Sequence, residues 1–303
     1  NIIEIKPDLS GVKPETQRVL IENATAPSMP EGKTGGLPAE GSQLFKVNGK
    51  YYLFNISWPP GGMRTVIVHK ADKLEGLYEG RVLLQDKGVA QGGLIDMPNG
   101  KWFAYLFQDF GAVGRIPFLV PVEWKDGWPI IGVNGKVPME LDLPESHGLT
   151  PHIVSSDEFN RNMDDPDLPL VWQWNHNPDN DLWSVSERMG YLRLKTGRLD
   201  DNFLQARNTL TQRTIGPTCI GSTSLDVSNM KDGDFAGLSL LQKNYGLVGV
   251  RIVGAKKFIV MVNASTGTPE EVAKIELDQD VVLFKAECDF TDKKDEANFF
   301  YSL

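Results

Sequence analysis

Cysteine and histidine are both scarce in this sequence, which has two cysteines and four histidines among 303 residues. Cys219 and Cys288 lack the close spacing that marks a zinc site or a redox motif. Two buried free thiols are the favoured interpretation, and a single disulfide is the alternative. The cysteines therefore give no support to a metal centre.

Long apolar runs are also absent. No stretch reaches the roughly 18–20 apolar residues that a membrane helix needs. The opening residues NIIEIKPDLSG lack the basic and apolar regions of a signal peptide. We expect no membrane partner, and secreted, periplasmic and cytoplasmic locations all stay open.

Acidic residues outnumber basic ones: there are 40 Asp and Glu against 31 Lys and Arg, a net charge of −9. This balance disfavours long-range attraction to nucleic acid, so we expect no nucleic-acid partner and a neutral ligand instead. With 41% hydrophobic residues, the composition is that of a globular protein, and the length allows two domains. No cofactor is expected.

The sequence repeats itself with a period of 51 residues. The match runs without a gap through four sets of aligned positions, which contain glycine, charged residues or amide residues. The aligned positions are Glu40-Gly41 with Gln91-Gly92, Asn48-Gly49-Lys50 with Asn99-Gly100-Lys101, Arg64 with Arg115, and Glu75-Gly76 with Asp126-Gly127. An ungapped match of this length indicates two copies of one structural unit.

Each copy of the repeat has the pattern of several short strands. Runs such as KYYLFNIS and RTVIVHKA, then KWFAYLFQ and RIPFLVPVEW, are rich in aromatic and β-branched residues and are separated by Gly, Pro and Asn turns. No long amphipathic helix interrupts them. A period near 50 residues with about four strands per unit is typical of a β-propeller blade.

Glu40 and Gln91 occupy the same position in the two units, at the start of the first strand. Because blades surround a common axis, the start of an innermost strand lies beside the central channel. We therefore expect both side chains to face one pocket, where the neighbouring glycines allow close approach. The alternative is that Glu40 is a solvated turn residue.

The first domain is predicted to span residues 1–144. Residues 1 to about 36 contain only the tail of a third unit, because IEIKPDLSG is similar to VHKADKLEG. The domain is therefore predicted to be a partial propeller of about two and a half blades, whereas closed propellers have about 4–8. We expect the missing blades to come from the rest of the protein or from another chain.

A polar, acidic stretch from 145 to 168 is predicted to be a linker. Residues 169–303 then return to short alternating strands, which predicts an antiparallel β-sandwich. Its last strand, ANFFYSL, lacks a closing turn, so we expect the sandwich to be incomplete at its C-terminus.

Two clusters in the second half have competing interpretations. The segment WNHNPDND, with His176, Asp179 and Asp181, fits turn chemistry at least as well as a metal site, and no metal is predicted. The tryptophans nearby fit a core more often than a sugar-stacking platform. They are Trp172, Trp174 and Trp183.

Three segments resemble one enzyme family: AEGSQLFKVNGKYYLF, QGGLIDMPNGKWFAYLFQDFGAVGRIPFLVPVEW and WQWNHNPDNDLWSVSERMGYLRLKTG. They are similar to the family 43 glycoside hydrolases of the β-xylosidase type. The resemblance implies an all-β fold in which a partial five-bladed β-propeller is followed by a concanavalin-like antiparallel sandwich. It also implies an inverting hydrolysis of β-1,4-xylo-oligosaccharides or α-L-arabinofuranosides.

The resemblance assigns roles to four residues. Glu40 matches the family's general acid, which protonates the departing glycosidic oxygen. Arg115 matches an arginine that reaches the sugar where cleavage occurs, and Trp58 is expected to line the sugar pocket. Gln91 stands where related members often have a histidine of the central channel, so we expect it in the substrate pocket without a channel-bound metal.

The family also needs an aspartate as general base and a second aspartate that tunes the acid, and neither has a counterpart here. Asp8, the first aspartate, lies in a blade tail instead of at a strand start. We expect a glycosidase with a xylo-oligosaccharide or arabinoside substrate, incomplete as this chain alone. The alternatives are a non-catalytic carbohydrate-binding protein and an interaction module without a sugar site.

Overall fold

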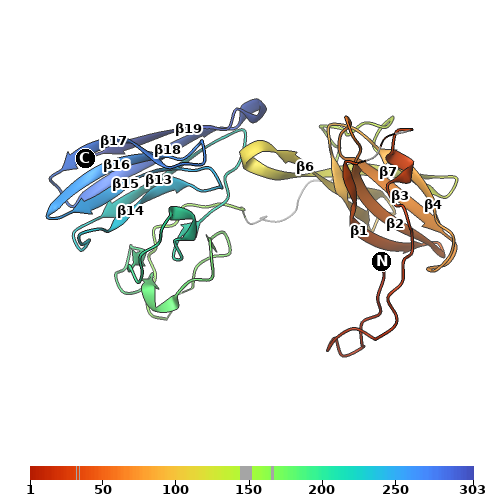
Figure 1. The fold of residues 1–303 in the computed structure, drawn as a ribbon, viewed down its shortest axis with the longest axis horizontal. Helices are drawn as coiled ribbons and strands as arrows, with labels where there is room; N and C mark the ends of the chain where they lie inside the picture. Colours follow the sequence, from red (N-terminus) through yellow and green to blue (C-terminus); the bar gives the residue numbers. More distant parts are fainter. Residues whose placement is uncertain (32, 34, 144–151, 165–166) are drawn as a thin grey trace. The chain divides into compact units, whose positions relative to one another are not determined.

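The computed structural model describes residues 1–31, 33, 35–143, 152–164 and 167–303 (Figure 1). The chain divides into two compact units: Asn1–Phe110 with Gly114–Glu145, and Gly111–Val113 with Ser146–Leu303. The described part contains only short 3-10 helices, none of which has the length and apolar character needed to cross a membrane. They are η1 (Ala26–Ser28), η2 (Gly111–Val113), η3 (Asn180–Leu182), η4 (Phe203–Gln205) and η5 (Thr291–Lys293).

The first unit contains two four-stranded sheets, one from each copy of the repeat, and every neighbouring pair of strands is antiparallel. The predicted all-β fold, with four strands per repeat, is confirmed. The first sheet contains β1 (Leu37–Val47), β2 (Lys50–Trp58), β3 (Thr65–Ala71) and β4 (Glu79–Leu84); the second contains β5 (Ala90–Asp96), β6 (Trp102–Phe110), β7 (Gly114–Lys125) and β8 (Trp128–Ile131).

The two sheets share one apolar core. Phe54 and Ile56 of β2 are 1% exposed and belong to the same cluster as Ala104 and Leu106 of β6. The two residues named in each strand are two positions apart, so their side chains lie on the same face of the sheet. Burial of a large apolar side chain stabilises the fold by about 1.5–3 kcal/mol.

The described residues before β1 contain no strand. Backbone bridges join Ile2 to Arg18 and Ile5 to Val12. The helix η1 lies against the first sheet, where a Cβ added to Gly80 of β4 would be 2.6 Å from Cγ of Pro27. This N-terminal segment therefore covers part of the first blade.

The second unit contains an antiparallel β-sandwich, as predicted. Valines of β15 and β18 and the ring of Phe284 lie in a core between its two sheets. One sheet contains β14 (Phe235–Leu240), β15 (Gly246–Val253), β16 (Lys256–Asn263) and β17 (Glu270–Leu277), and the other contains β13 (Thr218–Asp226), β18 (Val281–Asp289) and β19 (Glu296–Ser302). Two short strand pairs precede it: β9 (Gln173–Trp174) with β12 (Leu210–Thr211), and β10 (Trp183–Ser184) with β11 (Arg193–Leu194).

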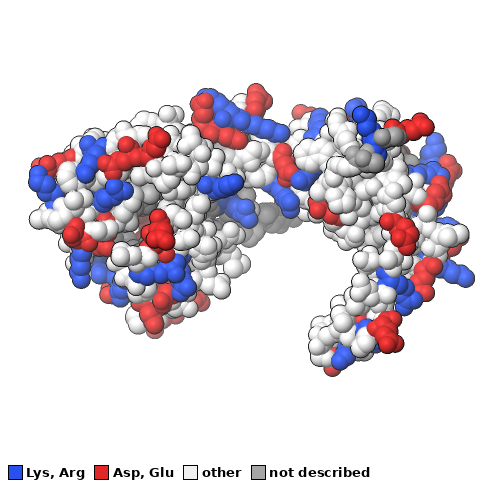
Figure 2. Space-filling view, in the orientation of Figure 1, with Lys and Arg blue, Asp and Glu red and all other residues white. Residues whose placement is uncertain are grey.

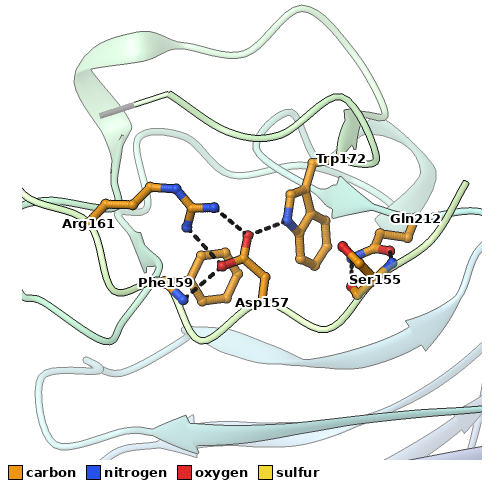
Figure 3. A network of polar contacts seen from close by, with 6 residues as sticks. All are labelled: Ser155, Asp157, Phe159, Arg161, Trp172 and Gln212. Atoms are coloured by element: carbon orange, nitrogen blue, oxygen red, sulfur yellow. Dashed lines mark hydrogen bonds and ion pairs between the residues drawn. The ribbon is translucent and has the colours of Figure 1, made fainter. Parts of the chain in front are cut away.

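Asp157 organises the segment before the sandwich (Figure 3). Its two carboxylate oxygens accept hydrogen bonds from both terminal nitrogens of Arg161, at 2.8 and 2.7 Å. Trp172 Nε1 and the backbone N–H of Phe159 donate two more, at 2.8 and 2.9 Å. Burial raises the pKa of Asp157, but these hydrogen bonds outweigh burial and hold the pKa below its usual value.

The range 145–168, predicted to be a linker, lies partly outside the described residues, which exclude 144–151 and 165–166. Its described part is bonded within the second unit. Ser155 N donates to Gln212 Oε1 at 2.9 Å, and Gln212 Nε2 donates to Ser155 O at 2.8 Å (Figure 3). The domain boundaries at 144 and 168 stay predictions.

Asp226, at the end of β13, makes the stability of the second unit depend on pH. Arg188 Nη1 donates to Asp226 Oδ2 at 2.6 Å, and Ser228 donates to Oδ1 from its hydroxyl and its backbone N–H. These bonds lower the pKa of Asp226 from 3.8 to about 2. Because the pKa is lower in the folded state, the stabilisation is complete above the unfolded pKa and is lost as the pH falls toward 2.

We therefore expect Asp226→Asn to lower the free energy of unfolding near neutral pH and to have little effect near pH 2. Urea unfolding of the chain at both pH values measures this. Asp278→Asn is the matched control, because Asp278 is exposed and has no ion pair in the described part of the chain. A loss of equal size at both pH values would contradict the prediction.

Candidate active site

Glu40 lies in β1 between two β-bulges. In the pairing of β1 with β2, Leu37, Glu40 and Gln43 face Trp58, Ile56 and Phe54, so β1 has an extra residue on each side of Glu40. Gly41 has a φ of +63°, a left-handed conformation that favours glycine. Bulges re-aim side chains beside many active sites, and here the Glu40 side chain is exposed.

Gln91 lies in a bulge of the second sheet at the equivalent position. Ala90 and Gly93 of β5 face Phe107 and Tyr105 of β6, so β5 has one extra residue there. Gln91 has a φ of +57° and Gly92 a φ of +145°. The repeat therefore reproduces a distortion of the backbone as well as a strand pattern.

The structure brings Gln91 against the residue that follows Glu40. A Cβ added to Gly41 would lie 2.6 Å from Nε2 of Gln91. The Oε1 atom of Gln91 is buried and has no hydrogen-bond partner among the described residues. An unpartnered buried acceptor costs free energy, so Oε1 of Gln91 lies in an unfavourable environment in this bulge.

Asn55 is a polar residue that sequence reasoning did not place near Glu40. It is 3% exposed, and its Nδ2 donates a hydrogen bond at 2.7 Å to Oγ of Ser42, the second residue after Glu40. Its Oδ1 has no partner in the described part of the chain. The sequence signal was a lone asparagine among the apolar residues of KYYLFNIS.

Arg64 and Arg115, which are equivalent in the repeat, both approach Asp109 of β6. Arg64 Nη2 is 2.5 Å from Asp109 Oδ2, and Arg115 Nε is 3.5 Å from Oδ1. The Arg64 side chain is only 14% exposed, whereas that of Arg115 is 61% exposed. Arg64 joins one blade to the next, and Arg115 presents its guanidinium group to solvent.

Aromatic rings flank both guanidinium groups. The ring of Phe107 lies 5.6 Å from Arg64 and 4.5 Å from Arg115, and the ring of Trp58 lies 5.7 Å from Arg64. Trp58 is 46% exposed, and its Nε1 donates to Gly62 O at 2.9 Å. Asp109 is the repeat equivalent of Trp58, 51 positions later, and that spacing was the signal that could have found it.

The predicted site residues all lie near the same end of their sheets, where β1, β5 and β7 begin and β2 ends. Glu40 and Gln91 are near the starts of β1 and β5, while Trp58 ends β2 and Arg115 begins β7. Because β1 and β2 are antiparallel, the start of one pairs with the end of the other, as Leu37 does with Trp58. The arrangement offers a carboxyl group, an amide, a guanidinium group and an indole ring, a set suited to a polyhydroxylated ligand.

The predicted turn near His176 contains local hydrogen bonds. Asp179 Oδ1 accepts from the N–H of Asp181 at 3.2 Å and caps η3, and His176 Nε2 lies 2.8 Å from Leu204 O. The described residues contain no group of three or more His, Cys, Asp or Glu side chains that could hold a metal ion.

Comparison with known proteins identifies the second unit. Residues 156–303 match the family model of the β-xylosidase C-terminal concanavalin A-like domain, GH43_C2. A β-xylosidase of Formosa agariphila is 29% identical over 72% of this chain and 44% of its own length. A non-reducing end α-L-arabinofuranosidase of Bacteroides ovatus is 26% identical over 53% of this chain. The chain spans less than half the length of either relative.

Solved structures match both units. A bifunctional GH43-CE of Bacteroides eggerthii is 68% identical with a TM-score of 0.94, and the match covers 99% of this chain and 38% of that one. The GH43 protein BlXynB of Bacillus licheniformis is 27% identical with a TM-score of 0.75 over 89% of this chain and 55% of its own.

The matched proteins combine propeller blades with a concanavalin A-like sandwich, and they are glycoside hydrolases. The chain belongs to glycoside hydrolase family 43, the β-xylosidase type with a C-terminal concanavalin A-like domain. The family resemblance and the fold class predicted from the sequence are confirmed.

Gly92 tests whether the bulge in β5 requires glycine. A Cβ at this position would collide with the carbonyl oxygen of Tyr105 on the paired strand. We expect Gly92→Ala to lower the free energy of unfolding by about 2–4 kcal/mol, because backbone strain and overpacking add. Gly49→Ala is the control: its φ is +80° but nothing lies within 4 Å of the added Cβ, so it should cost about 1–2 kcal/mol. Equal losses in urea unfolding would show that the contact with Tyr105 is unimportant.

Asp109 is expected to stabilise the first unit through its ion pair with Arg64. Asp109→Asn leaves the Arg64 guanidinium group buried without its counter-charge, so the free energy of unfolding should fall by about 1–3 kcal/mol. Asp72→Asn, which removes the exposed Lys50–Asp72 ion pair, should cause no measurable loss. If both variants unfold at the same urea concentration as the unmodified chain, Asp109 does not compensate Arg64.

Proposed function

We propose that the protein is an inverting glycosidase that acts on β-1,4-xylo-oligosaccharides, α-L-arabinofuranosides or both, with Glu40 as general acid. The observation that carries the proposal is the position of Glu40: an exposed carboxyl group between two bulges in a GH43 chain. Relatives that carry the names β-xylosidase and α-L-arabinofuranosidase support the substrate class.

In the proposed reaction, Glu40 donates its carboxyl proton to the glycosidic oxygen as the bond from C1 to that oxygen breaks. Water attacks C1 from the opposite face and gives a proton to a second carboxylate, so the anomeric configuration inverts. Inverting enzymes place the two carboxyl groups about 6.5–9.5 Å apart to leave room for this water. Glu40 supplies only one of the two groups.

We propose that the general base is an aspartate outside the 303 residues. Asp8, the first aspartate, accepts hydrogen bonds at Oδ1 from the N–H and hydroxyl of Ser10, at 3.0 and 2.8 Å. These bonds lower the pKa of Asp8, which weakens it as a base. In each of these relatives, the part that matches this chain is less than half of the relative's length.

The other predicted residues are proposed to hold the substrate. The guanidinium group of Arg115 rests on the Phe107 ring and can donate hydrogen bonds to sugar hydroxyls. Trp58 offers an exposed indole on which a sugar ring can stack, and Gln91 offers a buried amide. On the face drawn in Figure 2, acidic and basic side chains are interspersed in both units, which suits a neutral ligand.

Further propeller blades are the proposed partner of the second sheet. Strand register puts Ile95, Tyr105 and Ile130 on the face opposite to the shared core, where they are 38%, 52% and 40% exposed. An open apolar face on a blade is suited to packing against another sheet. The rest of the protein or another chain would supply that sheet.

Glu40→Gln in the full-length protein tests the proposal. A general acid contributes about 10²–10⁴-fold, and its help matters most when the leaving group is poor. We expect turnover of xylobiose to fall by about that factor, while an aryl β-xyloside with an acidic phenol keeps much more of its rate. Initial rates on the two substrates, with Glu79→Gln as an exposed control on the same sheet, measure the contrast.

Three outcomes contradict the proposal. Equal losses on both substrates would mean that Glu40 acts in binding or folding, and no loss on either would make it a solvated turn residue. If the unmodified full-length protein binds xylo-oligosaccharides in calorimetry without turning them over, the protein is a non-catalytic carbohydrate binder.

A further inference from the structure

The two cysteines, 69 positions apart in the sequence, lie directly opposite each other in the sandwich. Cys219 of β13 pairs with Cys288 of β18 in an unbroken register that runs from Thr218 with Asp289 to Asp226 with Val281. Both thiols are free; Cys219 is half-buried, and Cys288 is 5% exposed. Opposite residues have side chains on the same face of a sheet, so the two sulfur atoms are neighbours.

The register meets the distance requirement for a disulfide. Opposite residues of antiparallel strands have Cα atoms about 4.5–5.5 Å apart, and disulfides form at Cα separations of about 4.4–6.8 Å. We infer that Cys219 and Cys288 form a reversible intramolecular disulfide when the protein meets a disulfide oxidant such as oxidised glutathione. The bond would attach β13, an edge strand, to the central strand of its sheet.

The exchange balances in two steps. The thiolate of Cys219, the more accessible sulfur, attacks one sulfur of oxidised glutathione and releases one glutathione thiolate. The sulfur of Cys288, having lost its proton, then attacks Cys219 and releases the second. Two protein thiols are oxidised to one disulfide, and one oxidised glutathione is reduced to two glutathione molecules.

The two steps should differ in rate. Burial is the main cause, and the neighbouring Cys219 the second, that raises the pKa of the Cys288 thiol to about 12. Only a small fraction of Cys288 is thiolate near neutral pH, and the thiolate is the attacking species. The second step is therefore expected to be slow, so a mixed disulfide on Cys219 forms transiently before ring closure.

The bond should stabilise the second unit. It closes a loop of about 70 residues, and disulfides that close long loops restrict the unfolded chain most. We expect the oxidised chain to melt about 5–15 °C higher than the reduced chain in the transition of the second unit.

The experiment uses the complete chain, reduced and then incubated with oxidised glutathione. The expected product is a monomer about 2 Da lighter, because two hydrogens are lost, with a peptide that links residues 219 and 288 in a non-reducing digest. Dithiothreitol should restore the original mass and melting temperature. Incubation of the urea-unfolded chain under the same conditions verifies that the oxidant is active.

Single variants isolate the pair. Cys219→Ser replaces the half-buried cysteine and should abolish both the linked peptide and the thermal shift. Cys288→Ala, which puts no hydroxyl group at the buried position, is the second variant and should have the same two effects. A glutathione adduct on Cys219 that persists, a covalent dimer through Cys219, or a folded chain that stays reduced while the unfolded chain oxidises would each overturn the inference. A thermal shift that survives in Cys219→Ser would do the same.

Discussion

The shared core of the two repeat sheets is the constraint on which the candidate site depends. Phe54 and Leu106 are buried because their strands are held in one register, and a slip of one residue would turn every core side chain of a strand to the other face. An extra residue in β1 or β5 must then form a bulge without moving the rest of the strand. Glu40 lies between two such bulges and Gln91 lies in one, so core packing fixes where the polar groups lie.

The same core brings charged groups from different blades together. Arg64 follows the second strand of one sheet, and its counter-charge, Asp109, lies one residue before the end of the second strand of the next. Two nitrogens of this buried guanidinium group, Nε and Nη1, have no hydrogen-bond partner among the described residues. Asn55 Oδ1 and Gln91 Oε1 are also buried without a partner in the described part of the chain, as are His69 Nδ1 and Trp124 Nε1. Each such atom costs free energy in the folded chain, and functional sites are one place where proteins retain unsatisfied polar groups.

The second unit is stabilised by different means in its two parts. The sandwich depends on an apolar core between sheets, to which Phe284 contributes. The described residues of the segment before it contain short strand pairs and no larger sheet, and the carboxylate of Asp157 adds stability there by accepting four hydrogen bonds. A carboxylate this well satisfied is stable in its charged form despite burial. Removal of any one donor would leave a buried charge less well compensated.

The repeat, the strand pattern and the equivalence of Glu40 with Gln91 can all be read from the amino-acid sequence, because turn residues and alternating apolar residues are local signals. The tertiary structure alone decided that Arg64 is buried while Arg115, its repeat equivalent, is exposed, since burial depends on which blade lies alongside. It also decided that Cys219 lies opposite Cys288. The pairing of strands far apart in sequence depends on packing across the whole sheet, and no local pattern of residues contains that information.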